Sequence, residues 1–462
     1  MNNRLQPLPL AGLTAVLALG ALLTLTGCRD GAPKSSTAAA PFSGVGPLAI
    51  ALAPHAGATP IDDEIRRCQG QVRSNLNTRA TLERLGWLFV AKARAEFDPG
   101  FTTLAEQCAL ALDRVKPGCP ESLLLRGHTL QTQHRFKEAE PLARQLVAAR
   151  GLASDHGLLG DILADLGRVD EAAGAYQSML DLKPDPMGYA RAAHIRWLKD
   201  DLDGAIDLMR VAVAGVTPRD SDTAAWMHTQ LAKHLLQSGQ SASAATVLHT
   251  ALAFRTNFPP ALLCQGRMEL AAGRSADAVP MLRLAAQGNP LPEYHWALAE
   301  ALRATGATSD ALAVEARLVA EGQTSDPRTC SLFLSTRRER PELAVRLARQ
   351  ELGEREDVFT HDTLAWALAA AGRMDEAQQH LRSALALSTP DARLWFHAAV
   401  INARSGHAEE SRAWQTKATS VAHTLLPIEQ AILRELATDT SHRTALSNPF
   451  PAASSPDAAS EN

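Results

Sequence analysis

Apolar and small side chains recur along this chain with the spacing of paired amphipathic helices. The clearest example is the segment 158–186, in which two helical patterns are separated by Leu166-Gly167-Arg168. Apolar residues three and four positions apart share one face of a helix, and a glycine marks the end of the first helix. Gly160 and Ala172 are small enough to let the two helices approach at the usual 8–10 Å. Pro184 ends the unit, because proline cannot continue a helix.

The same unit recurs in one phase along most of the chain. An alanine marks each second helix at steps of 33, 33, 39, 34, 33, 33 and 33 residues: Ala139, Ala172, Ala205, Ala244, Ala278, Ala311, Ala344 and Ala377. A second series of small residues, glycine or alanine, marks the preceding helix and is interrupted only by Leu332. Its members are Gly86, Gly127, Gly160, Ala193, Ala232, Gly266, Ala299, Ala365 and Ala399. Glycines lie between the two series at Gly167, Gly239, Gly273, Gly306, Gly372 and Gly406. Three series in one phase indicate nine or ten repeated helix pairs.

A helix-turn-helix period near 34 residues with these small positions resembles the tetratricopeptide repeat. The resemblance covers about Thr78 to Ala422, although the early Trp and mid-helix Tyr of that family are mostly absent. It implies an all-α fold, a right-handed superhelical solenoid over residues 78–426 in which each repeat contacts its neighbours. The unit from Leu332 to Glu351 lacks a turn glycine, so we expect it to be the least regular.

Helical spacing returns in shorter segments at both ends of the predicted solenoid. We expect residues 61–77 to form an N-terminal capping helix and residues 427–438 to form a C-terminal one, because a solenoid needs its end repeats covered. Residues 439–462 are rich in Ser, Ala, Pro and Asn, which predicts a disordered tail.

The first 27 residues have the form of an export signal, with Arg4 followed by an apolar stretch. Leu25-Thr26-Gly27-Cys28 resembles the bacterial lipoprotein box, which implies cleavage before Cys28 and lipidation of its sulfur. Residues 28–60, rich in Ala, Pro, Gly, Ser and Thr, then read as a disordered tether. An uncleaved membrane helix and an incidental cysteine are the alternatives. Arg29 in place of Asp implies, by the same resemblance, the outer membrane of a bacterial envelope and a chain facing the periplasm.

Charge and cysteine usage add two expectations. The net charge is −4 with both signs interspersed, so the chain has no basic footprint for nucleic acid. Five cysteines follow Cys28 without a CxxC spacing, and Cys264 and Cys330 lie in apolar helical contexts as expected for small core residues. A disulfide among Cys68, Cys108 and Cys119 remains an open alternative.

The sequence contains no pattern that predicts catalysis. HExxH, P-loop, GxSxG and EF-hand motifs are absent, and the 15 histidines have no metal-ligand spacing. We therefore predict a protein that is not an enzyme, with no catalytic residues, no metal and no cofactor. An active site hidden in the irregular unit near Leu332 is the minor alternative.

The resemblance places certain positions of each first helix on the concave surface of the solenoid. The candidate partner-binding residues are Trp87, His128, Asp161, His194, Trp226, Lys233, Arg267, Trp296, Glu300 and Trp366. Leu263, Phe359 and Asp362 join them. Aromatic residues with charges of both signs suit an extended peptide, so we predict a membrane-anchored scaffold that binds a protein or peptide partner in envelope assembly or secretion. The alternatives are that these side chains only pack neighbouring helices, and that the solenoid binds carbohydrate or peptidoglycan.

Overall fold

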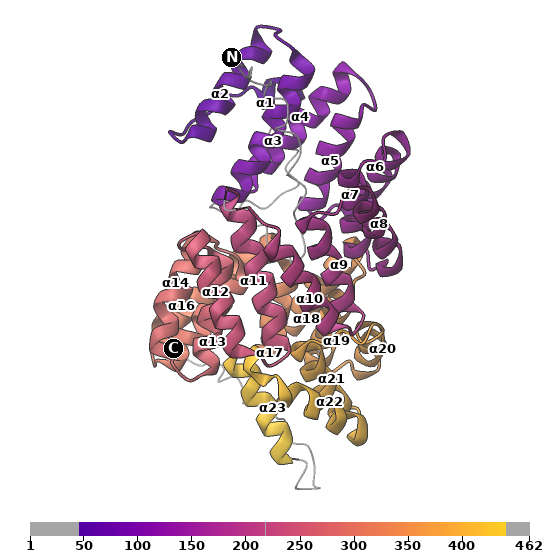
Figure 1. The fold of residues 1–462 in the computed structure, drawn as a ribbon. Helices are drawn as coiled ribbons and strands as arrows, with labels where there is room; N and C mark the ends of the chain where they lie inside the picture. Colours follow the sequence, from indigo (N-terminus) through magenta and orange to yellow (C-terminus); the bar gives the residue numbers. More distant parts are fainter. Residues whose placement is uncertain (1–45, 218, 440–462) are drawn as a thin grey trace, which may run out of the picture.

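The computed structural model describes residues 46–217 and 219–439, which form 23 α-helices, one 3-10 helix and no strand (Figure 1). The predicted all-α solenoid is confirmed. The predicted export signal, Cys28 and residues 440–462 lie outside the described part of the chain. Within that part, none of the helices combines the length and the apolar content that crossing a bilayer requires.

Ten helix pairs follow one another from residue 78 to residue 420. Each pair has a first, inner helix and a second, outer helix. The pairs are α3 (Thr78–Glu96) with α4 (Gly100–Val115), α5 (Pro120–Thr132) with α6 (Phe136–Ala149), α7 (Ala153–Asp165) with α8 (Val169–Leu182), α9 (Pro186–Leu198) with α10 (Leu202–Ala214), α11 (Ser221–Gln237) with α12 (Ser241–Phe254), α13 (Pro259–Ala271) with α14 (Ser275–Gly288), α15 (Pro292–Ala304) with α16 (Thr308–Ser325), α17 (Pro327–Arg337) with α18 (Pro341–Glu354), α19 (Val358–Ala370) with α20 (Met374–Ala384), and α21 (Ala392–Arg404) with α22 (Ala408–Ser420).

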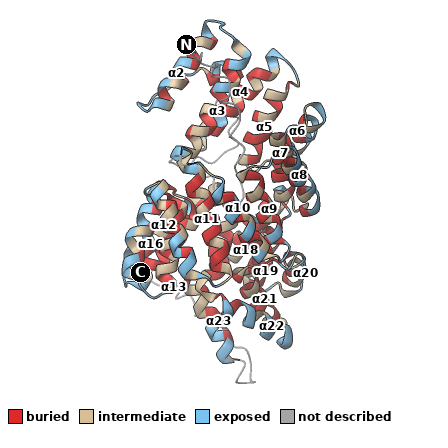
Figure 2. Cartoon of the chain, in the orientation of Figure 1, coloured by how far each residue is buried: buried red, intermediate tan, exposed pale blue. Residues whose placement is uncertain are grey.

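The small residues of the two series lie at the crossings within these pairs, where Figure 2 shows buried positions. All eight alanines of the outer helices are 0% exposed, and the glycines and alanines of the inner helices are buried as well. At Gly160 on α7, a Cβ atom would lie 2.3 Å from the Tyr176 ring on α8. The crossing therefore excludes even a methyl group, as the sequence pattern predicted.

Most turns between paired helices contain a residue in the left-handed conformation. The turn glycines have φ between 77° and 82°, and other pairs place His134 (φ 59°) or Asp200 (φ 65°) at the equivalent position. Between α17 and α18, Arg338 (φ 57°) and Arg340 (φ 46°) are both left-handed. This unit lacks a turn glycine, and its turn differs from the others. Residues with a Cβ are destabilised by about 1 kcal/mol in the left-handed conformation.

The N-terminal end differs in part from the expectation. Helix α2 (Pro60–Arg73) forms where the capping helix was predicted, but the predicted tether is wrong over residues 46–59, because α1 (Pro47–Ala51) packs against the solenoid. Ala51 is fully buried, and the Gln69 side chain donates hydrogen bonds to the carbonyls of Ala51 (3.1 Å) and Ala53 (2.8 Å). A short apolar run led by a proline at the first helical position is enough to form this turn of helix.

The five described cysteines are all buried and carry free thiols. Burial raises the pKa of Cys330 to about 12, and Cys264 is 6% exposed. These two cysteines behave as the predicted small core residues. At the other end of the chain, η1 (Ala422–Thr424) leads into α23 (Pro427–Asp439), which forms where the C-terminal capping helix was predicted.

The solenoid coils tightly enough for its later repeats to touch its earlier ones. Figure 1 shows α18 and α19 returning beside α9 and α10. Trp197 Nε1 donates to the Pro390 carbonyl (3.3 Å), and Thr389 Oγ1 donates to the Leu198 carbonyl (2.7 Å). Arg355 pairs with Asp165 at 3.0 Å. We call the set of bonds between residues 137–267 and residues 353–424 the inter-turn contact.

Candidate functional site

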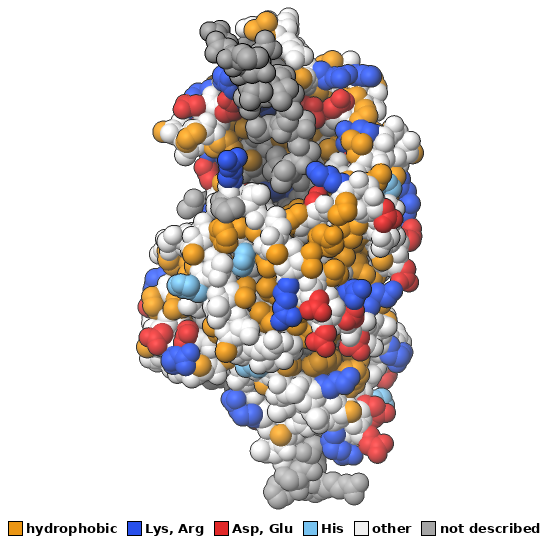
Figure 3. Space-filling view, in the orientation of Figure 1, with side chains coloured by type: hydrophobic (Ala, Val, Ile, Leu, Met, Phe, Trp, Pro, Cys, Tyr) orange, Lys and Arg blue, Asp and Glu red, His pale blue; other side chains and the backbone are white. Residues whose placement is uncertain are grey.

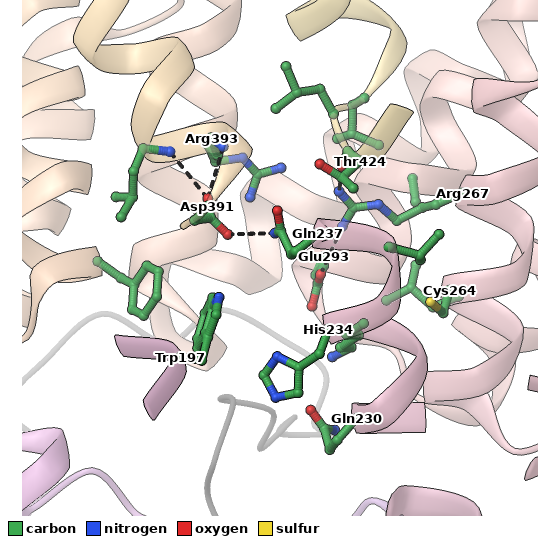
Figure 4. Close-up of a pocket in the computed structure, with 18 of the residues that line it drawn as sticks. Trp197, Gln230, His234, Gln237, Cys264, Arg267, Glu293, Asp391, Arg393 and Thr424 are labelled. Atoms are coloured by element: carbon green, nitrogen blue, oxygen red, sulfur yellow. Dashed lines mark hydrogen bonds and ion pairs between the residues drawn. The ribbon is translucent and has the colours of Figure 1, made fainter. Parts of the chain in front are cut away.

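A cavity of about 240 Å³ lies inside the coil (Figure 4). Its walls come from the inner helices of seven consecutive pairs, α9, α11, α13, α15, α17, α19 and α21, from Met209 on the outer helix α10, and from residues 423–426. One full turn of the solenoid therefore surrounds it, and the inter-turn contact between α9 and the start of α21 closes the ring. Apolar side chains also gather on the surface over α9 and its neighbours (Figure 3).

One wall of the cavity is aromatic. The Trp197 ring stacks on Phe359 with centroids 5.5 Å apart, and the rings of His194 (5.4 Å) and His234 (5.6 Å) lean on the same indole. Burial lowers the pKa of His194 to about 3 and that of His234 to about 4, with smaller contributions from His234 and Lys233 respectively. Both imidazoles are therefore neutral near pH 7, and this wall presents flat, uncharged surface.

The opposite part of the wall carries charged groups that are paired with one another. Arg267 contacts Glu293 at 3.3 Å and donates to the Thr424 carbonyl at 2.7 Å. Asp391 caps α21 by accepting from the backbone of Arg393 (2.9 Å), and it also accepts from Gln237 Nε2 (3.0 Å). Burial raises the pKa of Asp391. Arg267 and Gln237 thereby join wall helices to the later turn, so the cavity wall and the inter-turn contact share side chains.

Three polar groups of the wall lack such partners. The Lys233 ammonium group makes no hydrogen bond or ion pair with any residue in the described ranges. Trp296 is 1% exposed, and its Nε1 has no hydrogen-bond partner in the described part of the chain. The Oε1 atom of Gln237 is also buried without a partner, because Nε2 of the same amide faces Asp391.

The structure brings five of the ten candidate residues together. His194, Trp226, Lys233, Arg267 and Trp296 all line the cavity. Leu263, Phe359 and Asp362, the three additional positions, line it too.

Three other candidates lie on inner helices that precede the ring. Trp87 on α3 and His128 on α5 pack ring against ring with centroids 5.5 Å apart. Asp161 on α7 is buried in an ion pair with Arg191 (2.7 Å) and accepts from the Tyr176 hydroxyl (2.8 Å). These side chains join neighbouring repeats and do not line the cavity.

Glu300 and Trp366 are buried in helix interfaces. Glu300 contacts Arg337 and the backbone N–H of Ile428, both at 3.3 Å, and burial raises its pKa to about 7. Trp366 is 1% exposed, stacks on His397 with centroids 4.2 Å apart and donates from Nε1 to Thr336 Oγ1 at 3.0 Å. Neither residue reaches the cavity. Both pack neighbouring helices against each other, which was the alternative given for the candidate residues.

Sequence reasoning missed several residues of the wall. Trp197 lies one helical turn beyond His194, so the three-residue spacing places both on one face and offered a usable signal. Asp391 and Arg393 lie at the start of α21, and Thr424 ends η1, so all three lie far along the chain from α9 and α11. No local pattern marks them, because they reach the cavity only where the coil meets itself.

The described residues hold no cluster of three or more His, Cys, Asp or Glu side chains suited to a metal ion.

The arrangement of helix pairs defines a helical-repeat solenoid with a central cavity. A sequence profile of the tetratricopeptide repeat family matches residues 124–185, 263–326 and 363–422, so the chain contains tetratricopeptide repeats, as predicted.

Two similar solved structures are complexes of the human IFIT1 dimer, one with PPP-AAAA and one with m7Gppp-AAAA. Each is 17% identical to this chain with a TM-score of 0.47. The alignments cover 67% and 71% of this chain and 73% and 76% of the IFIT1 chain. A search of curated protein sequences gave no significant match.

Proposed function

We propose that this protein is a non-catalytic scaffold that binds a short segment of a partner protein in the cavity enclosed by its inner helices. The observation that carries the proposal is the cavity wall, in which neutral aromatic side chains form one part and Lys233 has no ion pair within the described residues. Pockets of this kind hold a ligand by apolar area and orient it by a few polar contacts. At about 240 Å³, the cavity suits a few side chains and not the extended peptide that the sequence suggested.

The aromatic side chains favour this proposal over the carbohydrate alternative. A sugar-binding tryptophan needs an uncovered face, but Phe359 covers Trp197, His397 covers Trp366, and the Arg393 guanidinium lies 5.3 Å from the Trp296 ring centroid. Trp226 is the half-buried indole of the wall and is the natural probe of occupancy.

Photo-crosslinking from position 226 tests the proposal. We expect benzoylphenylalanine in place of Trp226 to crosslink a protein partner in cells, and the same residue in place of Trp414, a half-buried indole on the outer helix α22, to give no such product. Trp226→Ala should weaken binding of the identified partner at least about tenfold, the scale of an interface anchor. Crosslinks of equal yield from both positions would contradict a role for the cavity.

We further propose that the chain is held at the bacterial envelope, facing the periplasm, by lipid on Cys28. The support is the lipoprotein-like box in the sequence. Cys28→Ala should abolish metabolic labelling by palmitate and move the protein from the membrane fraction to the soluble one, because acyl chains supply about 0.8 kcal/mol per buried methylene. Unchanged labelling of the variant would refute the anchor without bearing on the cavity.

A further inference from the structure

The charges around the cavity are almost completely matched within the protein. The basic side chains of the wall are Lys233, Arg267, Arg328 and Arg393, and the acidic ones are Glu293, Asp362 and Asp391. Arg393 pairs with Glu429 at 2.7 Å, and Asp362 contacts His397 at 2.8 Å.

Lys233 differs from its neighbours because its ammonium group has no ion pair within the described chain. It lies close enough to His234 and Cys264 to affect the pKa of each, although burial dominates both shifts. A cation in a mostly apolar wall is stabilised by an anion brought in by the ligand, which is how charge complementarity fixes the choice of partner.

Two neutral polar atoms of wall residues, Trp296 Nε1 and Gln237 Oε1, have no hydrogen-bond partner among the described residues. Each buried group left unpaired costs about 1–3 kcal/mol. Both atoms are enclosed by the protein, so a ligand in the cavity does not reach them. The charge of Lys233 is therefore the polar feature of the wall that selects the ligand.

The apolar part of the wall indicates that a bound segment carries a large apolar side chain beside its anion. The half-buried Phe359 ring covers Trp197, and Leu263, Met268 and Leu332 line the space beside Phe359. One large aromatic or aliphatic side chain buried there adds affinity in proportion to its area. Thioether groups such as Met268 adapt to its shape.

We propose that the segment recognised in this cavity is internal to its protein and carries an acidic side chain next to a large apolar one. The acidic side chain pairs with Lys233, and the apolar side chain packs on Phe359, Leu263 and Met268. This inference rests on the proposed function and adds the chemistry of the ligand to it.

Defined peptide pools test the inference by fluorescence anisotropy on the full chain in detergent. The probes are fluorescein-labelled, C-terminally amidated decapeptides with a central Phe-Glu, Phe-Gln or Phe-Lys pair and flanks randomised over uncharged residues. We expect the Phe-Glu pool to bind about tenfold more tightly than the Phe-Gln pool, the effect of one charge-assisted contact. Lys233→Gln should remove that preference, and Lys233→Glu should reverse it in favour of Phe-Lys.

Arg283→Glu on the exposed face of α14 is the matched charge reversal and should leave all three affinities unchanged. Circular dichroism and thermal melting establish that each variant is folded. Equal binding of the Phe-Glu and Phe-Gln pools, or an unchanged preference in Lys233→Glu, overturns the inference alone. A Phe-Gln pool with a free C-terminus that binds as tightly as the Phe-Glu pool also overturns the inference, because a terminal carboxylate is then the anion that pairs with Lys233. If the protein binds no pool, the inference fails, and the crosslink from position 226 still decides the proposed cavity function.

Discussion

Individual small residues decide whether the helices of this solenoid can pack. Gly160 and Gly174 lie in the same helix pair and have opposite surroundings. A Cβ atom at Gly160 would lie 2.3 Å from the Tyr176 ring, whereas a Cβ atom at Gly174 would meet nothing within 4 Å. The two positions therefore separate steric exclusion from the general helix propensity of glycine.

Gly160→Ala should destabilise the pair formed by α7 and α8 by about 1–3 kcal/mol, because the added methyl group displaces Tyr176 and its hydrogen bond to Asp161. Gly174→Ala should stabilise it by about 0.5–1 kcal/mol through helix propensity. Hydrogen exchange of the α7 and α8 amides measures both effects. Equal protection in the two variants would contradict a steric role for Gly160.

The two tryptophans Trp366 and Trp226 should respond differently to truncation. Trp366 fills an interface between α17 and α21, so Trp366→Ala should cost about 3–5 kcal/mol and lower the melting temperature. Trp226 is half-buried at the cavity, so Trp226→Ala should lower the melting temperature much less. A larger thermal loss in Trp226→Ala than in Trp366→Ala would reverse these assignments.

At the scale of elements, the N-terminal helices are held by one buried carboxylate. Asp62 on α2 is 1% exposed and contacts Lys92 on α3 (2.7 Å), His55 (2.7 Å) and both the backbone (2.9 Å) and hydroxyl (2.7 Å) of Thr59. Burial by itself raises the pKa of Asp62, but the hydrogen bonds from Lys92, Thr59 and His55 outweigh it and hold the pKa well below its usual range. The charged carboxylate thus joins α2, the preceding loop and α3.

Asp62→Asn should weaken this junction by about 3 kcal/mol, because Lys92 and His55 lose the charge that they surround. The expected result is faster hydrogen exchange in α1 and α2 with little change from α7 onward, since each repeat depends mainly on its neighbours. Asp63→Asn is the control, because the Asp63 side chain is 74% exposed and pairs with Arg66 as its one ion-pair partner among the described residues. Loss of protection in Asp63→Asn to the same extent would argue against the buried carboxylate.

For the whole molecule, the inter-turn contact turns an open coil into a closed ring. Arg355 stands between Asp165 (3.0 Å) and Asp357 (2.5 Å), so one guanidinium faces two carboxyl groups. Burial raises the pKa of Asp165 to about 7, whereas Arg355 and Arg328 hold the pKa of Asp357 below its usual value against the opposing effect of burial. The excess negative charge is relieved by a proton on Asp165.

The folded chain therefore retains a proton on Asp165 between about pH 4 and pH 7 that the unfolded chain has released. The contribution of Asp165 to the free energy of unfolding should fall as the pH rises through this window, by up to about 4 kcal/mol, and level off above about pH 8. The buried imidazoles of His194 and His234 contribute in the opposite direction, and Glu300 contributes in the same direction. Asp165→Asn removes only the Asp165 contribution, so the free energy of unfolding of the wild-type protein minus that of the variant should fall between pH 5 and pH 8. Chemical unfolding of both proteins at pH 5, 6, 7 and 8 makes the comparison, and parallel profiles would exclude Asp165 as the source.

The repeat architecture was readable from the sequence because its determinants are local. Ala172 and Gly160 lie twelve positions apart within one unit, and the turn glycine lies between them, so a short window contains the whole helix crossing. The same reasoning located the inner-helix positions His194, Trp226 and Lys233, which share a face of their helices and line the cavity.

Only the tertiary structure decided which of the inner-helix positions meet. The pitch of the coil results from many small rotations between repeats, and no short segment encodes their sum. That sum places Pro390 beside Trp197 and Thr424 beside Arg267, which closes a cavity around α9 to α21 and leaves Trp366 inside a helix interface. Local spacing determined the helix pairs, and contacts between residues about 150 to 190 positions apart determined the site.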